Sequence, residues 1–132
     1  LIIHCGDVCD ADVLKQLQAI KKVVAVQGNM DEPFLKKKLP LKEKLEIEGV
    51  KIGIYHGHGI SRDAVGNAAA QFSNEPVDII LYGHSHKPLI EKRGSMTLFN
   101  PGSPNDAVRA PYFSYGIIDI KEGHFKVSIV KI

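Results

Sequence analysis

The residues best suited to chemistry in this sequence follow four apolar segments. Each segment runs directly into polar side chains of a type that binds metal ions, with a glycine beside them. The four stretches are Ile2–Asp7, Val24–Asn29, Ile54–His58 and Ile79–His86. Ligands bind at the carboxyl ends of strands in α/β sheets, so we expect these polar residues to lie together, although they are far apart in the chain. The candidate ligands are Asp7, Asn29, His56, His84 and His86.

These side chains offer imidazole nitrogens, a carboxylate and an amide carbonyl, a set that suits Mn²⁺, Zn²⁺, Fe or Ni²⁺. His84 and His86 are two residues apart, so on an extended backbone their side chains face the same way and each can serve one of two adjacent ions. Asp7 can bridge such a pair with its two oxygens. Two ions about 4 Å apart clamp a phosphoryl group and activate a water molecule. The set therefore predicts a site for phosphoester hydrolysis.

Taken singly, each candidate has a simpler explanation. A lone histidine after a strand is usually a core or turn residue, and Asp7 or Asn29 can serve as a helix cap or Asx turn. Turn chemistry explains poorly why four separate strands end alike, and Asp10 already supplies a cap for the helix that follows Asp7. The repetition favours a metal centre over four independent turns.

Strand and helix signals alternate in the first half of the chain. The predicted strands there are Leu1–Cys5, Val23–Val26, Leu45–Glu48, Lys51–Tyr55 and Val77–Tyr82, with helices at Ala11–Ile20 and Ser61–Ser73. The second half contains strand signals alone, at Leu89–Lys92, Ser95–Phe99, Tyr112–Ile120 and His124–Ile132. This order predicts an α/β fold of two mixed β-sheets packed face to face and flanked by helices.

Composition limits the alternatives. The 132 residues suffice for one domain with one core, and no repeat or linker divides residues 1–132. A net charge of +2 does not call for nucleic acid or an anionic membrane as a partner, and no apolar run is long enough for a membrane span. The run Lys36–Lys38 fits a solvated surface. Cys5 and Cys9 form no disulfide framework, so a reducing cytoplasm is the expected location.

The order and separation of four motifs resemble the calcineurin-like metallophosphoesterases. The motifs are Gly6-Asp7, Gly28-Asn29, His56-Gly57 and Gly83-His84-Ser85-His86. The small single-domain phosphodiesterase branch of this superfamily is the most similar, because Asn100–Ser103 and the C-terminal hairpin also match it. The resemblance covers essentially the whole chain.

The resemblance implies a ligand for each motif. Asp7 resembles the aspartate that bridges two divalent ions, with Mn²⁺ expected and Ni²⁺, Zn²⁺, Fe or Mg²⁺ as alternatives. Asn29, His56 and His84 resemble the other ligands of one ion, and His86 resembles a ligand of the second. His58 is expected near the phosphate. The implied reaction is attack on a small phosphoester by a hydroxide held between the two ions.

Two features depart from the family pattern. The family begins with a strand ending in Asp-x-His that supplies two further ligands, and this sequence has none before Leu1. We therefore expect the first strand to be missing and the native protein to carry about 20–30 more residues at its N-terminus. In addition, Met30 stands where many family phosphatases have a histidine that protonates the leaving group. Asp31 and His58 are the candidate replacements, and weak acid catalysis favours activated diesters.

Two other readings compete with a phosphodiesterase. The retromer subunit related to this branch works chiefly as an interaction platform, so a scaffold with little or no catalysis is the main alternative. A single structural zinc site is a third, disfavoured because the candidate ligands come from four distant strands. The substrate is left open between a cyclic nucleotide, a 2′,3′-cyclic phosphate, a small diester and a monoester.

Overall fold

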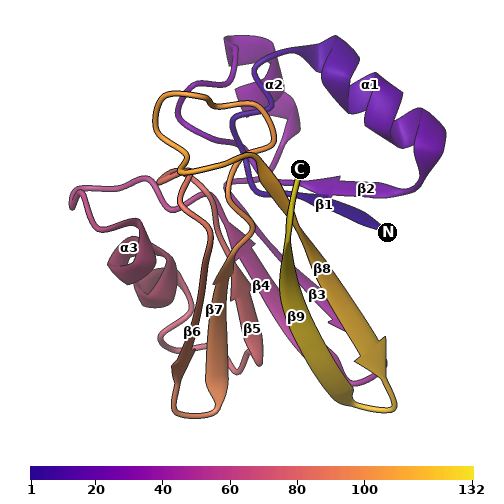
Figure 1. Ribbon diagram of the computed structural model, residues 1–132, viewed down its shortest axis with the longest axis vertical. Helices are drawn as coiled ribbons and strands as arrows, with labels where there is room; N and C mark the ends of the chain where they lie inside the picture. The colour runs from indigo at the N-terminus through magenta and orange to yellow at the C-terminus, as the bar shows by residue number, and fades with distance from the viewer.

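A five-stranded mixed sheet forms the centre of the protein in a computed structural model that describes residues 1–132 (Figure 1). Its strands, in spatial order, are β3 (Lys42–Ile47), β4 (Val50–Tyr55), β5 (Ile79–Leu81), β7 (Met96–Asn100) and β6 (Leu89–Arg93). The three inner strands are parallel, and each edge strand is antiparallel to its neighbour. The segments that follow β4 and β5 therefore leave the sheet at the same edge.

Two smaller sheets cover one face of this central sheet. Strand β1 (Ile2–His4) pairs in parallel with β2 (Val23–Ala25), and β8 (Ser114–Lys121) forms a long antiparallel hairpin with β9 (His124–Lys131). Apolar side chains of all four strands pack against the buried core of the central sheet. The predicted pair of packed sheets is confirmed, with the second layer made of two separate two-stranded sheets.

Alternation along the central strands separates the two faces of the sheet. On β4, Ile52 and Ile54 point into the core between the layers, while Tyr55 packs with helix α3 (Ala64–Gln71) on the opposite face. Phe72 closes this second core against Gly53, where a Cβ atom would lie only 2.7 Å from the phenyl ring. Period-two alternation thus places β4 and β5, the strands that lead into His56 and His84, between two apolar layers.

The helices lie outside the sheets (Figure 1). Helix α1 (Ala11–Ile20) has the predicted bounds, and the Asp10 carboxylate caps it by accepting a hydrogen bond of 2.8 Å from the Asp12 amide. Helix α3 is shorter than predicted because Ser61 Oγ accepts the Asp63 N–H in a local turn, so the helix begins at Ala64. None of these helices is long and apolar enough to cross a membrane.

A short helix that was not predicted, α2 (Pro33–Lys38), lies between the second and third strands. Pro33 occupies the first turn, where a missing N–H costs nothing. The side chain of Leu35 is fully buried with Val8 and Leu14 of the α1 region. Six residues are too few to show helical periodicity, which explains why the pattern gave no signal. The lysines of the last turn are exposed, as expected.

Candidate metal centre

Three of the candidate ligands meet in one small volume. The metal-binding atoms of Asp7, His56 and His84 all lie within 4.8 Å of one another. His56 Nε2 is 3.1 Å from Asp7 Oδ2 and 3.3 Å from His84 Nδ1. Each residue follows a different strand, β1, β4 or β5, so the packing of the small β1–β2 sheet against the central sheet creates the cluster.

A hydrogen bond between the two layers determines which nitrogen of His56 faces the cluster. His56 Nδ1 lies 2.7 Å from the carbonyl oxygen of Cys5, which can only accept, so Nδ1 carries the proton. The ring is only 1% exposed, and in its neutral form it presents the lone pair of Nε2 to Asp7 and His84. Converging lone pairs from imidazoles and a carboxylate repel one another unless a cation lies between them. The donor set therefore fits a divalent metal ion.

The electrostatic environment favours the metal-binding protonation states. Burial lowers the pKa of the His84 imidazole, and the neighbouring ring of His56 lowers it further. Burial alone would raise the pKa of Asp7, but the His56 ring and the Met30 N–H facing its carboxylate outweigh this effect and hold the pKa below its ordinary value. Near neutral pH, His84 is accordingly neutral and Asp7 ionised.

The backbone at the site is strained. Asp7, His84 and His86 have φ angles of 56°, 63° and 58°, in the left-handed region that residues with a side chain rarely adopt. Such conformations cost of the order of 1–3 kcal/mol each and cluster at functional sites. The fold holds all three residues in this conformation despite the cost. Tertiary contacts, and not local backbone preference, therefore set the directions of their side chains.

Two glycines permit the close approach of the ligand loops. A Cβ atom on Gly28 would lie 2.1 Å from Asp7 Oδ1, and one on Gly6 would lie 2.6 Å from His56 Nδ1. Both distances are far inside van der Waals contact. The glycines next to the candidate ligands thus leave room for the carboxylate and imidazole of neighbouring loops.

Asn29 lies in the loop that contacts Asp7. The preceding Gly28 touches the Asp7 side chain, and the following Met30 donates its N–H to Asp7 Oδ1 at 2.7 Å. The carbonyl oxygen of Asn29 accepts a hydrogen bond of 2.6 Å from Lys36 Nζ of helix α2. Asn29 is therefore beside the cluster, and its side-chain amide is free of hydrogen bonds within the chain.

His86 stands apart from the group of three. Its Nδ1 contacts the carboxylate of Asp106, which belongs to the loop between β7 and β8. His84 and His86 are separated by Ser85 alone, and both have left-handed rather than extended backbone, so the expected common direction is not found and the two imidazoles contact different partners. Asp106 was not among the candidates, because nothing in the spacing of its loop signals a link to His86.

The two candidate proton donors have different surroundings. Asp31 is buried, and its carboxylate accepts the N–H groups of Cys9 at 2.8 Å and Gly28 at 2.7 Å, so it joins the loops after β1 and β2. The His58 ring stacks on Tyr55 with centroids 5.5 Å apart, and its buried Nδ1 has no hydrogen-bond partner. His58 borders the cluster, with its ring centroid 5.5 Å from that of His56.

Asn100 supports the loop that carries His84. This fully buried side chain donates from Nδ2 to the Gly83 carbonyl oxygen at 2.9 Å and to Ser85 Oγ at 3.0 Å, while its Oδ1 accepts the Gly102 N–H at 2.9 Å. The residues on both sides of His84 are therefore tied to the end of β7. The Asn100–Ser103 motif marked this segment, but its contact with Gly83 and Ser85 was not predicted.

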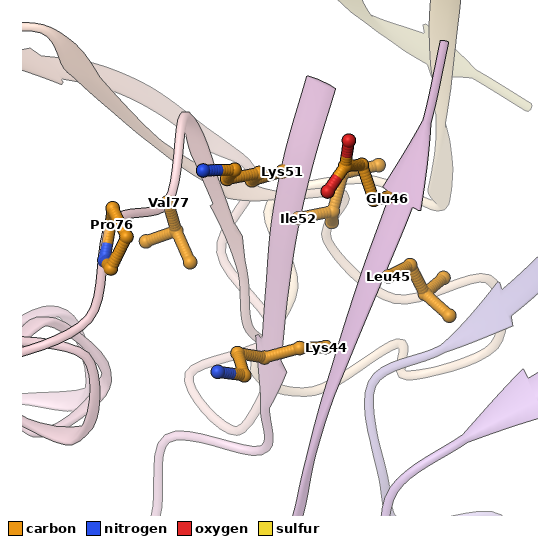
Figure 2. A pocket seen from close by; sticks show the side chains of 7 residues that line it. All are labelled: Lys44, Leu45, Glu46, Lys51, Ile52, Pro76 and Val77. Carbon is orange, nitrogen blue, oxygen red and sulfur yellow. The ribbon is translucent and has the colours of Figure 1, made fainter. Parts of the chain in front are cut away.

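A separate hollow of about 300 Å³ lies across β3 and β4, away from the cluster (Figure 2). Its lining residues are Lys44, Leu45, Glu46, Lys51, Ile52, Pro76 and Val77. No candidate ligand faces it, and Lys44 is already paired with Glu75 at 2.6 Å. The candidate metal ligands lie at the strand ends instead.

Comparison with known proteins agrees with this geometry. A probable metallophosphoesterase from Methanocaldococcus jannaschii is 45% identical over 105 residues, which make up 79% of this chain and 53% of that protein. Phosphodiesterase YfcE from Escherichia coli K12 is 32% identical over 115 residues, covering 83% of this chain and 59% of its own. The chain thus spans between half and three fifths of the length of these two relatives.

A solved structure shares both fold and some sequence. Vps29 from Entamoeba histolytica, complexed with Zn²⁺, superposes with a TM-score of 0.72 at 26% identity, over 98% of this chain and 80% of that one. Residues 1–123 match the calcineurin-like phosphoesterase superfamily domain. The sequence motifs, the fold and the cluster of ligand atoms agree with that match, and this chain belongs to the calcineurin-like phosphoesterase superfamily.

Proposed function

We propose that this protein is a metal-dependent phosphodiesterase that works with two divalent ions, Mn²⁺ being the expected metal. The observation that carries the proposal is the convergence of Asp7, His56 and His84 within 4.8 Å, with the proton of His56 on the far nitrogen. Membership of the superfamily and the likeness to phosphodiesterase YfcE support it. A small phosphoester in the cytoplasm is the proposed substrate, with no membrane or nucleic-acid partner.

The proposed ligands divide between two ions. Asp7, Asn29, His56 and His84 would hold one, and Asp7 and His86 would contribute to the other. Bound there, divalent ions supply an activated water as nucleophile and neutralise charge on the phosphoryl oxygens. The chain holds its ligand side chains ready for this task through the hydrogen bond from His56 to Cys5 and the tie from Met30 to Asp7.

Protonation of the leaving group falls to the side chains beside the cluster. Met30 is exposed and has no proton to give. Asp31 is buried and both its oxygens already accept backbone hydrogen bonds, whereas the His58 ring borders the cluster, with its centroid 5.5 Å from that of His56. We therefore place His58 ahead of Asp31 as the acid. Because burial lowers the pKa of His58, only a small fraction of it is protonated at neutral pH, which favours esters with good leaving groups.

The test is hydrolysis of bis-p-nitrophenyl phosphate and p-nitrophenyl phosphate with Mn²⁺, Ni²⁺, Zn²⁺ and Mg²⁺, each supplied to metal-depleted protein. We expect the diester to be the better substrate and Mn²⁺ to support the highest rate. His84→Ala and Asp7→Asn should each lower kcat/KM by about two orders of magnitude or more, because a lost ligand weakens both metal occupancy and charge stabilisation.

His124→Ala is the matched control for these variants. His124 is exposed at the start of β9, and its Nδ1 contacts the nearby Glu122 carbonyl oxygen at 3.0 Å, away from the cluster, so its loss should leave activity unchanged. Full turnover by metal-depleted wild-type protein, or by His84→Ala, would contradict the proposal.

A scaffold with little or no catalysis is the second candidate, supported by the likeness to the Vps29 structures. It predicts little or no turnover of any ester in the series, whether or not metal is bound. Calorimetric titration with Mn²⁺ beside the activity assay separates the two candidates, because the phosphodiesterase proposal requires both binding and turnover.

A further inference from the structure

The carboxylate of Asp106 connects the turn of its own loop with the ring of His86. Its Oδ1 accepts the N–H groups of Val108 at 2.8 Å and Arg109 at 3.0 Å. Its Oδ2 contacts His86 Nδ1, 20 residues away in sequence. The side chains of His86 and Asp106 are 23% and 17% exposed, so the contact is largely shielded from water. The two oxygens of Asp106 thus serve two different segments.

This arrangement determines the tautomer of the imidazole. An ionised carboxylate can only accept hydrogen bonds, so His86 Nδ1 must donate, and the neutral form of the ring has its lone pair on Nε2. Histidines that bind metal ions commonly donate their other N–H to a carboxylate or carbonyl, which fixes the tautomer and the ring orientation. His56 shows the same design nearby, with the Cys5 carbonyl oxygen as acceptor.

We propose that Asp106 is a positioning residue that holds His86 as the Nδ1–H tautomer and so presents Nε2 as the metal-binding nitrogen. The inference rests on the proposed function, because it takes His86 as a ligand of the second ion. The backbone agrees with such a role: His86 is held in the left-handed region, so packing rather than local preference sets the direction of its side chain.

Asp106→Asn separates this role from support of the loop. The asparagine oxygen can still accept the Val108 and Arg109 N–H groups, and those two donors prevent the amide from flipping. Its NH₂ group then takes the place of Oδ2 and donates to His86 Nδ1. The turn survives, while the ring must move its proton to Nε2, where it blocks metal binding.

The first readout is the tautomer of His86, observed by two-bond ¹H–¹⁵N correlation in metal-free protein labelled with ¹⁵N-histidine. His86→Gln identifies the signals of this ring. We expect the Nδ1–H form in the wild type and the Nε2–H form in Asp106→Asn. This readout does not depend on catalysis. A protein that binds Mn²⁺ without hydrolysing esters would therefore contradict the proposed function and leave this inference standing.

The second readout is Mn²⁺ affinity by calorimetry, which we expect Asp106→Asn to weaken about ten- to a hundredfold. Ser103→Ala is the control, because Ser103 Oγ accepts the Asp106 N–H at 3.2 Å in the same loop without contacting His86. It should leave both tautomer and affinity unchanged. A doubly protonated or Nε2–H His86 in the wild type at pH 7.5 would overturn the proposal, as would unchanged affinity in Asp106→Asn.

Discussion

At the candidate metal centre, a residue without a side chain matters because it leaves room for the candidate ligands of a neighbouring loop. Gly28 lets the loop after β2 lie against Asp7, whose Oδ1 would be 2.1 Å from a Cβ atom at this position. The Met30 N–H in the same loop then reaches Asp7 Oδ1 at 2.7 Å. A side chain at position 28 would push apart two loops that both carry proposed ligands.

Gly28→Ala should therefore weaken Mn²⁺ binding about tenfold or more, because Asp7 must move to admit the methyl group. The matched control is Gly49→Ala in the β3–β4 turn, where φ is +82° and no atom lies within 4 Å of the new Cβ. That variant should lose about 1 kcal/mol of stability through backbone strain and keep its metal affinity. Calorimetric titration and urea unfolding of both variants check this, and equal metal affinity in the two would contradict it.

Among the elements, helix α3 and the strands it covers position the site without contributing ligands. Phe72 at the end of α3 is 2% exposed and packs against the face of the sheet opposite the β1–β2 layer. Its ring also lies 5.2 Å from Lys42 Nζ, which pairs with Glu75. The strand β4, which leads into His56, is thereby held from behind.

Phe72→Ala should lower the free energy of unfolding by about 3–5 kcal/mol, because a large buried ring leaves a cavity. Phe34→Ala in α2 removes a ring that is 60% exposed and should cost about 1 kcal/mol or less. Urea denaturation followed by circular dichroism measures both. A loss of similar size in the two variants would show that the second core does not support the sheet as described.

Helix α2 is the one helix that the hydrophobic periodicity of the sequence did not predict. The strands and helix α1 have regular periodicity, and their positions were predicted to within a few residues. Helix α2 has only six residues, and a single buried side chain, Leu35, anchors it to residues of two other segments. Its existence depends on that tertiary contact, which no local pattern reveals.

Over the whole molecule, partly buried histidines couple stability to pH. Burial lowers the pKa of His4, His58 and His84 below the ordinary value of 6.5. As the pH falls, the unfolded chain therefore binds protons at these positions at a higher pH than the folded chain does. By linkage, the metal-free protein loses stability as pH falls below about 6.5.

The melting temperature of metal-free protein should accordingly be lower at pH 5.5 than at pH 7.5. Saturating Mn²⁺ should raise it at pH 7.5, by the equivalent of about 2.7 kcal/mol at a hundredfold excess over Kd, and by less at pH 5.5, because protons compete for the imidazoles. Differential scanning fluorimetry measures both effects. His84→Ala should show a much smaller response, and equal Mn²⁺ stabilisation at the two pH values would contradict the expectation.

Residue types and periodicity were enough to predict the strands and the kinds of side chain at their ends, because these properties are local. The closeness of His56 and His84 follows from strand order, since the parallel strands β4 and β5 expose their ends at one edge. Asp7 joins them only because the separate β1–β2 sheet packs against the central sheet. Contacts across loops needed the folded chain. Three contacts show this: the Cys5 carbonyl oxygen with His56 Nδ1, the Cys9 N–H with the Asp31 carboxylate, and the Asp106 carboxylate with His86 Nδ1. Their partners are 20 to 51 residues apart in the chain, and only packing brings them together.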